Sequence, residues 1–411
     1  MRIIRRRRWG RVVAIVMVVV GLSAGYAYWS LNRPLPSLKP TLIDLPQSTP
    51  APQSKFGWPS GGQAAIGVIG TNVIETNGQQ KAAPIASAAK IITALVVLDK
   101  KPLAKGQQGP IITLGADDVA RYQHYAANDG SVVTVRSGEQ ISEYQMLQTI
   151  LLPSANNMAD SLAVWAYGSL ENYAKAANVY VSKLGLSSTK IGSDASGLSP
   201  DTTSSASDLV RLGKLAMDNP VLAEIVGQSS AGDIPVAGTI KNVNFLLGTD
   251  GVIGVKTGNT EEAGGVFVAA AEFKVNGKRV ITTTAIIGAP SLFAAMKQSL
   301  PLIDSARNNF KSTSVIKAKS IVGKYNLPWG GSLPAVASHD LSLMTWGGKP
   351  VSTKTLLKPI DANTAHAGLS VGQLIVPASA TTNQKSVTIK LSSNPIQPSA
   401  WWRLIHPFFS Q

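Results

Sequence analysis

The 411-residue chain contains no cysteine, which excludes a disulfide framework, a thiol nucleophile and any metal site built on cysteine. Histidine is also scarce, and the histidines are far apart with no ligand-like spacing. This distribution argues against a metallopeptidase and against a Ser-His-Asp hydrolase, so lysine is the plausible base for a nucleophilic serine. No metal and no cofactor are expected. The histidines are His124, His339, His366 and His406.

Acidic residues are outnumbered, because 23 aspartates and glutamates face 38 lysines and arginines and leave a formal net charge of +15. A solvated basic surface is the simplest interpretation. Attraction to an anionic cell wall or lipid surface is a sharper one. Nucleic acid is not an expected partner, because the sequence has no basic stripe with interleaved stacking aromatics.

The N-terminal region has the pattern of a membrane anchor. Residues 1–11 are rich in arginine, as in a cytoplasmic basic segment, and residues 12–29 form an apolar run that ends in aromatic residues. This run has about 18 residues, near the lower limit for crossing a bilayer. The alternative is a cleaved secretory peptide, since Gly25-Tyr26-Ala27 loosely imitates a cleavage site. We favour a retained single-pass anchor in the cell membrane, and both alternatives put the rest of the chain outside the cytoplasm.

Composition divides the remaining chain into further segments. Residues 30–60 are rich in Pro, Ser, Gln and Thr, which is typical of an extended linker. Residues 61–305 predict a catalytic domain, whereas residues 306–400 alternate Val- and Thr-rich strands with turn signals and predict a small all-β domain. The aromatic tail, residues 401–411, sets Trp and Phe beside Arg, which suits membrane contact or packing against the β domain.

Three short stretches, in order along the chain, together predict a serine acyl-transfer site. A Ser-x-x-Lys that opens a helix puts both side chains on one face, so the amine can reach the hydroxyl and make the serine nucleophilic. Ser-x-x-Lys also occurs elsewhere in the chain, but the strict Lys-Thr-Gly occurs once, so order and spacing carry the prediction. The stretches are Ser87-Ala-Ala-Lys90, Ser154-Ala-Asn156 and Lys256-Thr257-Gly258.

The surroundings of these stretches suit the chemistry. An apolar run after Lys90 predicts a helix with Ser87 in its first turn. Pro153 ends an amphipathic stretch, so Ser154 is expected on a turn between helices. The segment around and after Gly258 predicts a strand hairpin at the core of a sheet.

With these motifs the chain resembles the penicillin-interacting serine D-alanyl-D-alanine carboxypeptidases, the low-molecular-mass penicillin-binding proteins. The similarity includes Ala195-Ser-Gly-Leu198, Asn244-Phe-Leu-Leu-Gly248 and the stretch from Gly368 to Leu374, and it covers roughly residues 61 to 400. It implies a serine β-lactamase/D,D-peptidase-like α/β (α+β) catalytic domain, in which helices flank a central antiparallel sheet. It also implies two partners: peptidoglycan stem peptides ending in D-Ala-D-Ala, and β-lactam antibiotics.

The resemblance implies a role for each residue of the first two motifs. Ser87 would attack the carbonyl of the penultimate D-Ala as the acyl-ester nucleophile, while an uncharged Lys90 takes its proton as general base. This requires a depressed pKa for Lys90, for which burial and the nearby charge of Lys256 are the expected causes. Ser154 would relay a proton to the leaving amine, and Asn156 would hold the substrate's amide backbone.

The third motif is implied to bind substrate. Lys256 and Thr257 would bind the terminal carboxylate, and Gly258 would let the substrate approach the backbone. The oxyanion would be held by the backbone N–H groups of Ser87 and Asn259, which are fixed donors.

The chain departs from the family pattern at Asn157, where aspartate is usual, and at Asn259, where an aromatic residue or histidine is common. Both departures are expected to affect substrate preference.

Other functions stay open. A β-lactamase uses the same acylation chemistry, but one common type needs a glutamate-held water, and here Glu171 is followed by no glutamate until Glu224. A non-catalytic wall-binding scaffold would not need the intact motif residues. Endopeptidase or transpeptidase activity would change only the leaving group or the acyl acceptor.

Overall fold

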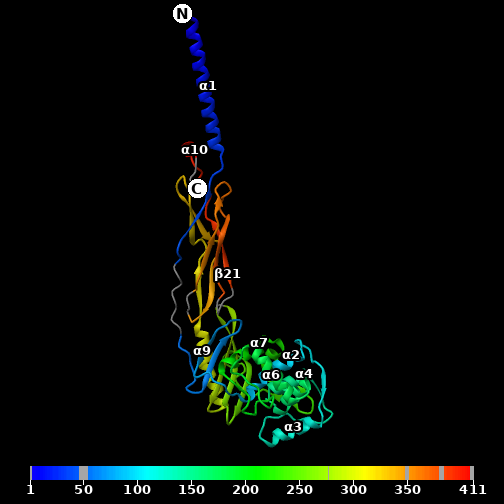
Figure 1. Ribbon diagram of the computed structural model, residues 1–411. Helices are drawn as coiled ribbons and strands as arrows, with labels where there is room; N and C mark the ends of the chain where they lie inside the picture. Colours follow the sequence, from blue (N-terminus) through cyan, green and yellow to red (C-terminus); the bar gives the residue numbers. More distant parts are fainter. Residues whose placement is uncertain (1, 46–53, 276, 348–350, 379–383, 408–411) are drawn as a thin grey trace. The chain divides into compact units, whose positions relative to one another are not determined.

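Contacts within the computed structural model divide the chain into two compact units (Figure 1). The central unit consists of Pro52–Lys311 with Trp346–Gly348. The terminal unit joins Met1–Ala51 to Ser312–Thr345 and Lys349–Gln411. The structure describes residues 2–45, 54–275, 277–347, 351–378 and 384–407.

An antiparallel sheet with the strand order β11-β12-β13-β3-β4 forms the middle of the central unit. Strand β12 is buried along most of its length, which explains its run of Val, Phe and Ala, because a strand covered on both faces is apolar throughout. Strand β11 lies at one edge of the sheet. The strands are β3 (Gln63–Val68), β4 (Ile74–Asn77), β11 (Val252–Thr260), β12 (Gly264–Val275) and β13 (Lys278–Ala289).

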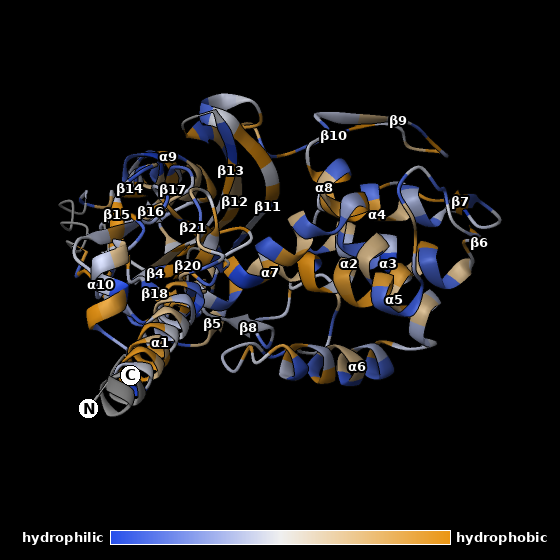
Figure 2. Ribbon diagram, turned by 90° about the horizontal axis from the view of Figure 1, so that it is seen from above, coloured by the Kyte–Doolittle hydropathy of each residue, from blue (hydrophilic) through white to orange (hydrophobic). Residues whose placement is uncertain are grey.

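Helices cover this sheet on both sides (Figure 2). Helix α9 (Leu292–Asn309) packs against β12 and β13, and helix α7 (Ala206–Asp218) packs against β3 and β13. Each begins at a serine, Ser291 or Ser205, whose hydroxyl accepts a hydrogen bond from the first turn. An antiparallel sheet flanked by helices confirms the predicted fold class.

Helix α2 is the centre of a helical layer beside the sheet. Its residues from Ala89 to Leu98 are all buried, and it contacts α4, α5, α6 and α7. A helix that is apolar on every side needs such neighbours. The helices of this layer are α2 (Ala89–Lys100), α3 (Ala116–Ala127), α4 (Glu143–Leu151), α5 (Asn156–Tyr167), α6 (Leu170–Lys183) and α8 (Pro220–Val226).

The central unit also contains short pairs of antiparallel strands outside the main sheet. They are β5 (Ala83–Pro84) with β8 (Thr203–Ser204), β6 (Ile111–Thr113) with β7 (Gln140–Ser142), and β9 (Ser230–Ile234) with β10 (Gly238–Lys241).

The terminal unit is built on a second sheet, with the strand order β18-β20-β21-β16-β15-β2. Alternating buried and exposed residues along β20 and β21 match a sheet with one face in a core. Two pairs complete the unit: β1 (Ser37–Leu38) with β19 (Ile360–Asp361), and β14 (Phe310–Ile316) with β17 (Leu341–Trp346). The sheet strands are β2 (Pro40–Leu42), β15 (Ile321–Asn326), β16 (Ser332–Ala337), β18 (Lys354–Leu357), β20 (Ser370–Val376) and β21 (Lys385–Leu391).

Part of the stretch predicted as an extended linker, 30–60, is sheet. Strand β2 pairs with β15, and the side chains of Leu35 and Leu38 are buried in the core of the terminal unit. These leucines are few among prolines and serines, and their burial depends on distant strands, so composition alone did not predict it. Residues 46–53 of the stretch lie outside the described residues.

Two helices belong to the ends of the chain. Helix α1 (Arg2–Asn32) extends beyond the apolar run predicted at 12–29 and contacts α10 (Ala400–Ile405). The Tyr26 hydroxyl donates to the Leu404 carbonyl at 2.6 Å, and the Ser30 hydroxyl donates to the Arg403 carbonyl at 2.5 Å.

The C-terminal helix also packs against the β-rich part of the terminal unit. The rings of Trp402 and Trp329 meet edge to face with centroids 5.5 Å apart. The tail therefore makes the packing contact that the sequence offered as one alternative, while Phe408 and Phe409 lie outside the described residues.

Candidate active site

Ser87 lies in a short 3-10 turn, η1 (Ala86–Ala88), immediately before helix α2. Ile85 and Ala88 on either side of Ser87 are fully buried, which fixes the turn in the core. Strand β11 packs against this turn at Gly258, where an added Cβ would lie 3.1 Å from the backbone nitrogen of Ser87. Ser87, predicted in the first turn of the helix, thus lies in a tighter 3-10 turn just before it. Gly258 on the facing strand leaves room for this turn.

Lys90 joins the first two motifs. Its Nζ is 2.8 Å from Ser87 Oγ and donates to Asn156 Oδ1 at 2.7 Å and to the Ser196 carbonyl at 2.9 Å. The side chain is 0% exposed. When Lys90 is neutral, its two N–H bonds point to the Asn156 and Ser196 oxygens. Its lone pair is then left to accept a hydrogen bond from the Ser87 hydroxyl.

Burial lowers the pKa of Lys90 to about 7. The nearby charges are the carboxylates of Asp194 and Asp160, and they act in the opposite direction by favouring the ammonium form. The sequence interpretation named burial and the charge of Lys256 as the causes. Burial is the main cause. The charges of the two amines oppose each other, since charge on Lys90 lowers the pKa of Lys256.

Ser154 sits between helices α4 and α5, as predicted from Pro153. Its backbone has a φ of 69°, a left-handed conformation that costs a non-glycine residue energy and is often found at functional sites. The residue is only 6% exposed, and its hydroxyl accepts a hydrogen bond from Lys256 Nζ at 2.9 Å. The turn therefore aims Ser154 at the third motif.

The third motif lies on the edge strand β11. Lys256 is 1% exposed, and its Nζ also donates to the Thr257 carbonyl at 2.9 Å. Burial, followed by the charge of Lys90, holds the pKa of Lys256 well below its ordinary value. The structure thus brings all three predicted motifs together, as two lysine–serine pairs: Lys90 with Ser87 and Lys256 with Ser154.

Asn156 is the first residue of helix α5 and is 3% exposed. Its backbone N–H donates to the Ser131 carbonyl at 2.7 Å, while its side-chain oxygen accepts from Lys90. Its Nδ2 faces Gly130, where an added Cβ would lie 2.9 Å away.

The two departures from the family pattern have different surroundings. Asn157 is fully buried, and its amide exchanges hydrogen bonds with the backbone of Val133 at 3.1 and 2.9 Å. Asn157, which follows Asn156 in the chain, therefore fixes the loop at Val133. Asn259 is exposed and accepts a hydrogen bond from the backbone N–H of Leu292 at 3.1 Å.

A loop from Asp194 to Ser199, which we call the 194–199 loop, was seen in the sequence only as a family resemblance. Asp194 accepts hydrogen bonds from the backbone N–H groups of Ser196, Gly197 and Ser199 at 2.6, 2.5 and 2.7 Å. The loop presents the Ser196 carbonyl to Lys90. Sequence reasoning missed Asp194 and Asp160. For Asp160 the available signal was a carboxylate inside a largely apolar stretch, whereas Asp194 lies among small polar residues that give no such signal.

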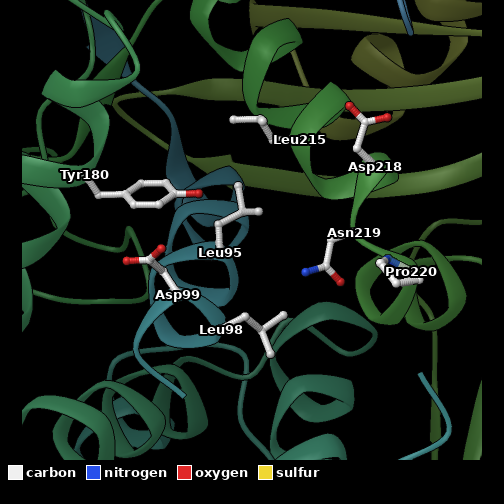
Figure 3. A pocket seen from close by; sticks show the side chains of 8 residues that line it. All are labelled: Leu95, Leu98, Asp99, Tyr180, Leu215, Asp218, Asn219 and Pro220. Atoms are coloured by element: carbon white, nitrogen blue, oxygen red, sulfur yellow. The ribbon is translucent and has the colours of Figure 1, made fainter. Parts of the chain in front are cut away.

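A cavity of about 410 Å³ lies near the other end of helix α2 (Figure 3). Leu95, Leu98 and Leu215 form its apolar part, and Asp99 and Asp218 bring carboxylates to it. The lining residues of the cavity on α2 begin at Leu95, about one and a half helical turns after Lys90, and none of the motif residues lines it. Across the described ranges, no group of three or more His, Asp or Glu side chains could hold a metal ion.

Comparison with known proteins finds similarity to D-alanyl-D-alanine peptidases. A family model described as D-alanyl-D-alanine carboxypeptidase matches residues 65–291. The D-alanyl-D-alanine carboxypeptidase DacF of Bacillus subtilis is 25% identical over 312 residues, which cover 73% of this chain and 76% of that protein. The D-alanyl-D-alanine endopeptidase of Pseudomonas aeruginosa is 33% identical over 193 residues, 44% of this chain and 57% of that protein.

The fold is shared with solved structures. A peptidoglycan synthesis regulatory factor (PBP3) from Streptococcus pneumoniae superposes with a TM-score of 0.60 at 19% identity, covering 83% of this chain and 100% of that chain. At this identity the likeness shows the fold alone.

Proposed function

The chain belongs to the D-alanyl-D-alanine carboxypeptidase family and is a serine peptidase, and we propose that Ser87 carries the acyl group when it removes the terminal D-Ala from peptidoglycan stem peptides. The observation that carries this assignment is the contact between Lys90 and Ser87. A fully buried amine lies 2.8 Å from the hydroxyl, with its pKa lowered to about 7 and its remaining N–H bonds engaged. Such an amine can act as a general base near neutral pH.

In the proposed acylation, Lys90 takes the Ser87 proton as Oγ attacks the carbonyl of the penultimate D-Ala. The leaving amine of the terminal D-Ala must gain a proton. Ser154 is suited to deliver it, because its hydroxyl is held by Lys256 at 2.9 Å and can pass on a proton that Lys256 replaces.

Lys256 and Thr257 are proposed to bind the terminal carboxylate of the substrate. In the free protein the charge on Lys256 is disfavoured by burial and by Lys90. An arriving carboxylate favours the ammonium form of Lys256, and this positive charge then disfavours the ammonium form of Lys90. Substrate binding would thus leave Lys90 neutral at the moment when a base is needed.

The oxyanion is proposed to lie between the backbone N–H groups of Ser87 and Asn259. Support comes from Gly258, the residue between the third motif and Asn259, which packs on the Ser87 turn with no side chain in the way. Fixed backbone donors of this kind contribute about 3 kcal/mol to the transition state.

Deacylation by water completes the cycle. The partners of Glu171 and Glu224 separate this proposal from a β-lactamase with a glutamate-held water. Glu171 forms an exposed ion pair with Lys175 at 2.6 Å, and Glu224 accepts a hydrogen bond from the Tyr144 hydroxyl at 2.8 Å. Both glutamates have partners outside the motif residues, which supports the peptidase. β-Lactams remain the expected covalent inhibitors.

One helix of the described chain, Trp9–Asn32, is long and apolar enough to cross a membrane, and it is compatible with a single-pass anchor or a signal sequence. We propose that it is retained and that the central unit is extracytoplasmic. The arginine-rich start favours a cytoplasmic N-terminus. Retention is supported by the hydrogen bond from the Tyr26 hydroxyl to the Leu404 carbonyl, because cleavage after Ala27 would remove it.

The test is release of D-Ala from diacetyl-Lys-D-Ala-D-Ala by the purified full-length protein. We expect release by the wild type and none above background for Ser87→Ala. Ser187→Ala is the matched control, because exposed Ser187 begins a second Ser-x-x-Lys far from the other motifs in sequence, and it should leave the rate unchanged. Failure of folded wild-type protein to release D-Ala would overturn the carboxypeptidase assignment.

Endopeptidase activity is a second candidate, favoured by the similarity to the Pseudomonas aeruginosa protein. The same acyl-enzyme would form from a cross-linked peptide with a longer leaving group. Comparing the rates on cross-linked and uncross-linked muropeptides separates the two activities, and Ser87→Ala should abolish both.

A further inference from the structure

Asp160 is a buried carboxylate that the proposed mechanism does not use. It lies on helix α5, one turn beyond Asn156, and is 5% exposed. Its Oδ2 accepts from the Tyr125 hydroxyl at 2.7 Å, and its Oδ1 accepts from the backbone N–H of Ala195 at 2.8 Å. Both carboxylate oxygens are therefore engaged, by α3 on one side and by the 194–199 loop on the other.

The Ala195 contact leads directly to the base. The carbonyl of the next residue, Ser196, accepts a hydrogen bond from Lys90 Nζ at 2.9 Å. The Ala195 carbonyl accepts from the Thr93 hydroxyl on α2 at 2.6 Å. Asp160 thus ties down the peptide that supplies one of the two acceptors of Lys90.

The charge of Asp160 also acts on Lys90. The titratable groups that face this carboxylate are Lys90 on α2, Tyr125 on α3, Tyr173 on α6 and Asp194 in the 194–199 loop. Burial raises the pKa of Asp160 to about 6, opposed by its hydrogen bonds to Tyr125 and Ala195. An ionised Asp160 favours the ammonium form of Lys90.

We propose that Asp160 is a positioning residue for Lys90: it holds the 194–199 loop against the amine, and its negative charge raises the pH at which Lys90 becomes a base. The inference rests on the proposed role of Lys90 in acylating Ser87. The hydrogen bonds of the Asp160 carboxylate go to Tyr125 and Ala195, so Asp160 acts through Lys90 and the loop.

The test is the pH profile of acylation by a fluorescent penicillin, measured on full-length Asp160→Asn. Asparagine can still accept from Ala195 N–H, and the Tyr125 hydroxyl can turn to accept from the new amide, so the loop is retained. Removing the charge lowers the pKa of Lys90 and moves the acid limb of the profile to lower pH. Because wild-type Asp160 itself becomes neutral near pH 6, the gain is confined to about pH 6 to 7. There a midpoint shift of about half a unit makes acylation up to about twofold faster.

Tyr125→Phe provides a second, independent variant. Loss of the hydroxyl raises the pKa of Asp160, so Asp160 stays neutral over a wider range and the acid limb moves in the same direction by a smaller amount. In the Asp160→Asn background the same change should add no further shift, because both act through one carboxylate. This variant carries the test if Asp160→Asn fails to fold.

Asp208→Asn is the matched control. Asp208 is also a buried aspartate, 4% exposed, and accepts from Ser188 N–H and the Thr189 hydroxyl, but it does not act on Lys90. It should lower thermal stability without moving the midpoint. An unmoved or raised midpoint in both Asp160→Asn and Tyr125→Phe overturns the inference. A wild type that forms no adduct on Ser87 overturns the proposed function instead.

Discussion

Lys90 and Lys256 are 0% and 1% exposed, and a site that contains two such amines cannot easily hold two positive charges. Burial lowers the pKa of both, and charge on Lys90 lowers that of Lys256 further. The two serines contact different amines, because Ser87 lies at Lys90 and Ser154 is bonded to Lys256. At this scale the proposal is that a substrate carboxylate moves the charge to Lys256 and frees Lys90.

Lys90→Arg tests the need for a neutral base. A guanidinium stays protonated at every accessible pH, so it cannot accept the Ser87 proton. We expect acylation by penicillin to fall by about 100-fold or more. Stopped-flow or gel-based adduct formation measures this, with thermal unfolding as a check on folding. An arginine variant that acylates at the wild-type rate would exclude Lys90 as the base.

Gly258→Ala tests the fit between β11 and the Ser87 turn. The added Cβ would lie 3.1 Å from Ser87 N and from the Ile85 carbonyl, so the turn must shift by a few tenths of an ångström. A misplaced nucleophile is costly, and we expect acylation to slow by about 10- to 100-fold. Gly232→Ala is the control, because an added Cβ meets nothing within 4 Å there. Equal rates for both variants would contradict the account.

At the scale of elements, four segments form the candidate active site: the η1 turn, the α4–α5 turn, strand β11 and the 194–199 loop. Gly197 in this loop has a φ of 75°, and an added Cβ would lie 2.2 Å from the Ala86 carbonyl of the Ser87 turn. The loop and the turn therefore hold each other, although they are far apart in the sequence.

Gly197→Ala should break this contact. We expect loss of both stability and acylation, because a left-handed backbone and a clash with main chain add together. Gly185→Ala separates the two effects, since Gly185 has a φ of 68° but nothing within 4 Å of an added Cβ. It should cost about 1 to 2 kcal/mol of unfolding free energy and leave acylation unchanged. Urea unfolding and penicillin binding on both variants make the comparison.

The local sequence pattern predicts the helices and turns around the motifs. It does not predict the contacts between segments that are distant in the sequence. The helix after Lys90 and the break at Pro153 follow from periodicity and turn chemistry. The Ser87 turn packs closely on Gly258 of a distant strand, and nothing in the local sequence around Ser87 indicates this contact. The role of Asp160 depends on Tyr125 and Ala195, and a buried carboxylate on a helix gives no sign of such partners in one sequence.

At the scale of the whole molecule, each unit joins segments from distant parts of the chain. The terminal unit combines the first 51 residues with residues beyond 311, and its sheet pairs β2 with β15. Strand pairs so far apart in sequence leave no local signal, so the predicted linker contained no strand. Because this unit contains both ends of the chain, it includes the apolar helix α1 and the C-terminal helix α10.

Membrane attachment is predicted to depend on α1. Full-length protein should remain in the membrane pellet after alkaline extraction, and a variant lacking residues 2–32 should be released. Arg403→Ala is the control, since it removes only the hydrogen bonds from Arg403 to the carbonyls of Leu31 and Arg33. It should stay in the pellet. Release of the full-length protein would contradict a retained anchor.

The most direct test of the central claim is mass spectrometry of full-length protein after brief incubation with penicillin, followed by peptide mapping of the adduct. The account predicts one penicilloyl group on Ser87 in the wild type and none in Ser87→Ala. An adduct on another serine, or no adduct on folded protein that still releases D-Ala, would contradict the assignment of Ser87 and Lys90 as the acylating pair.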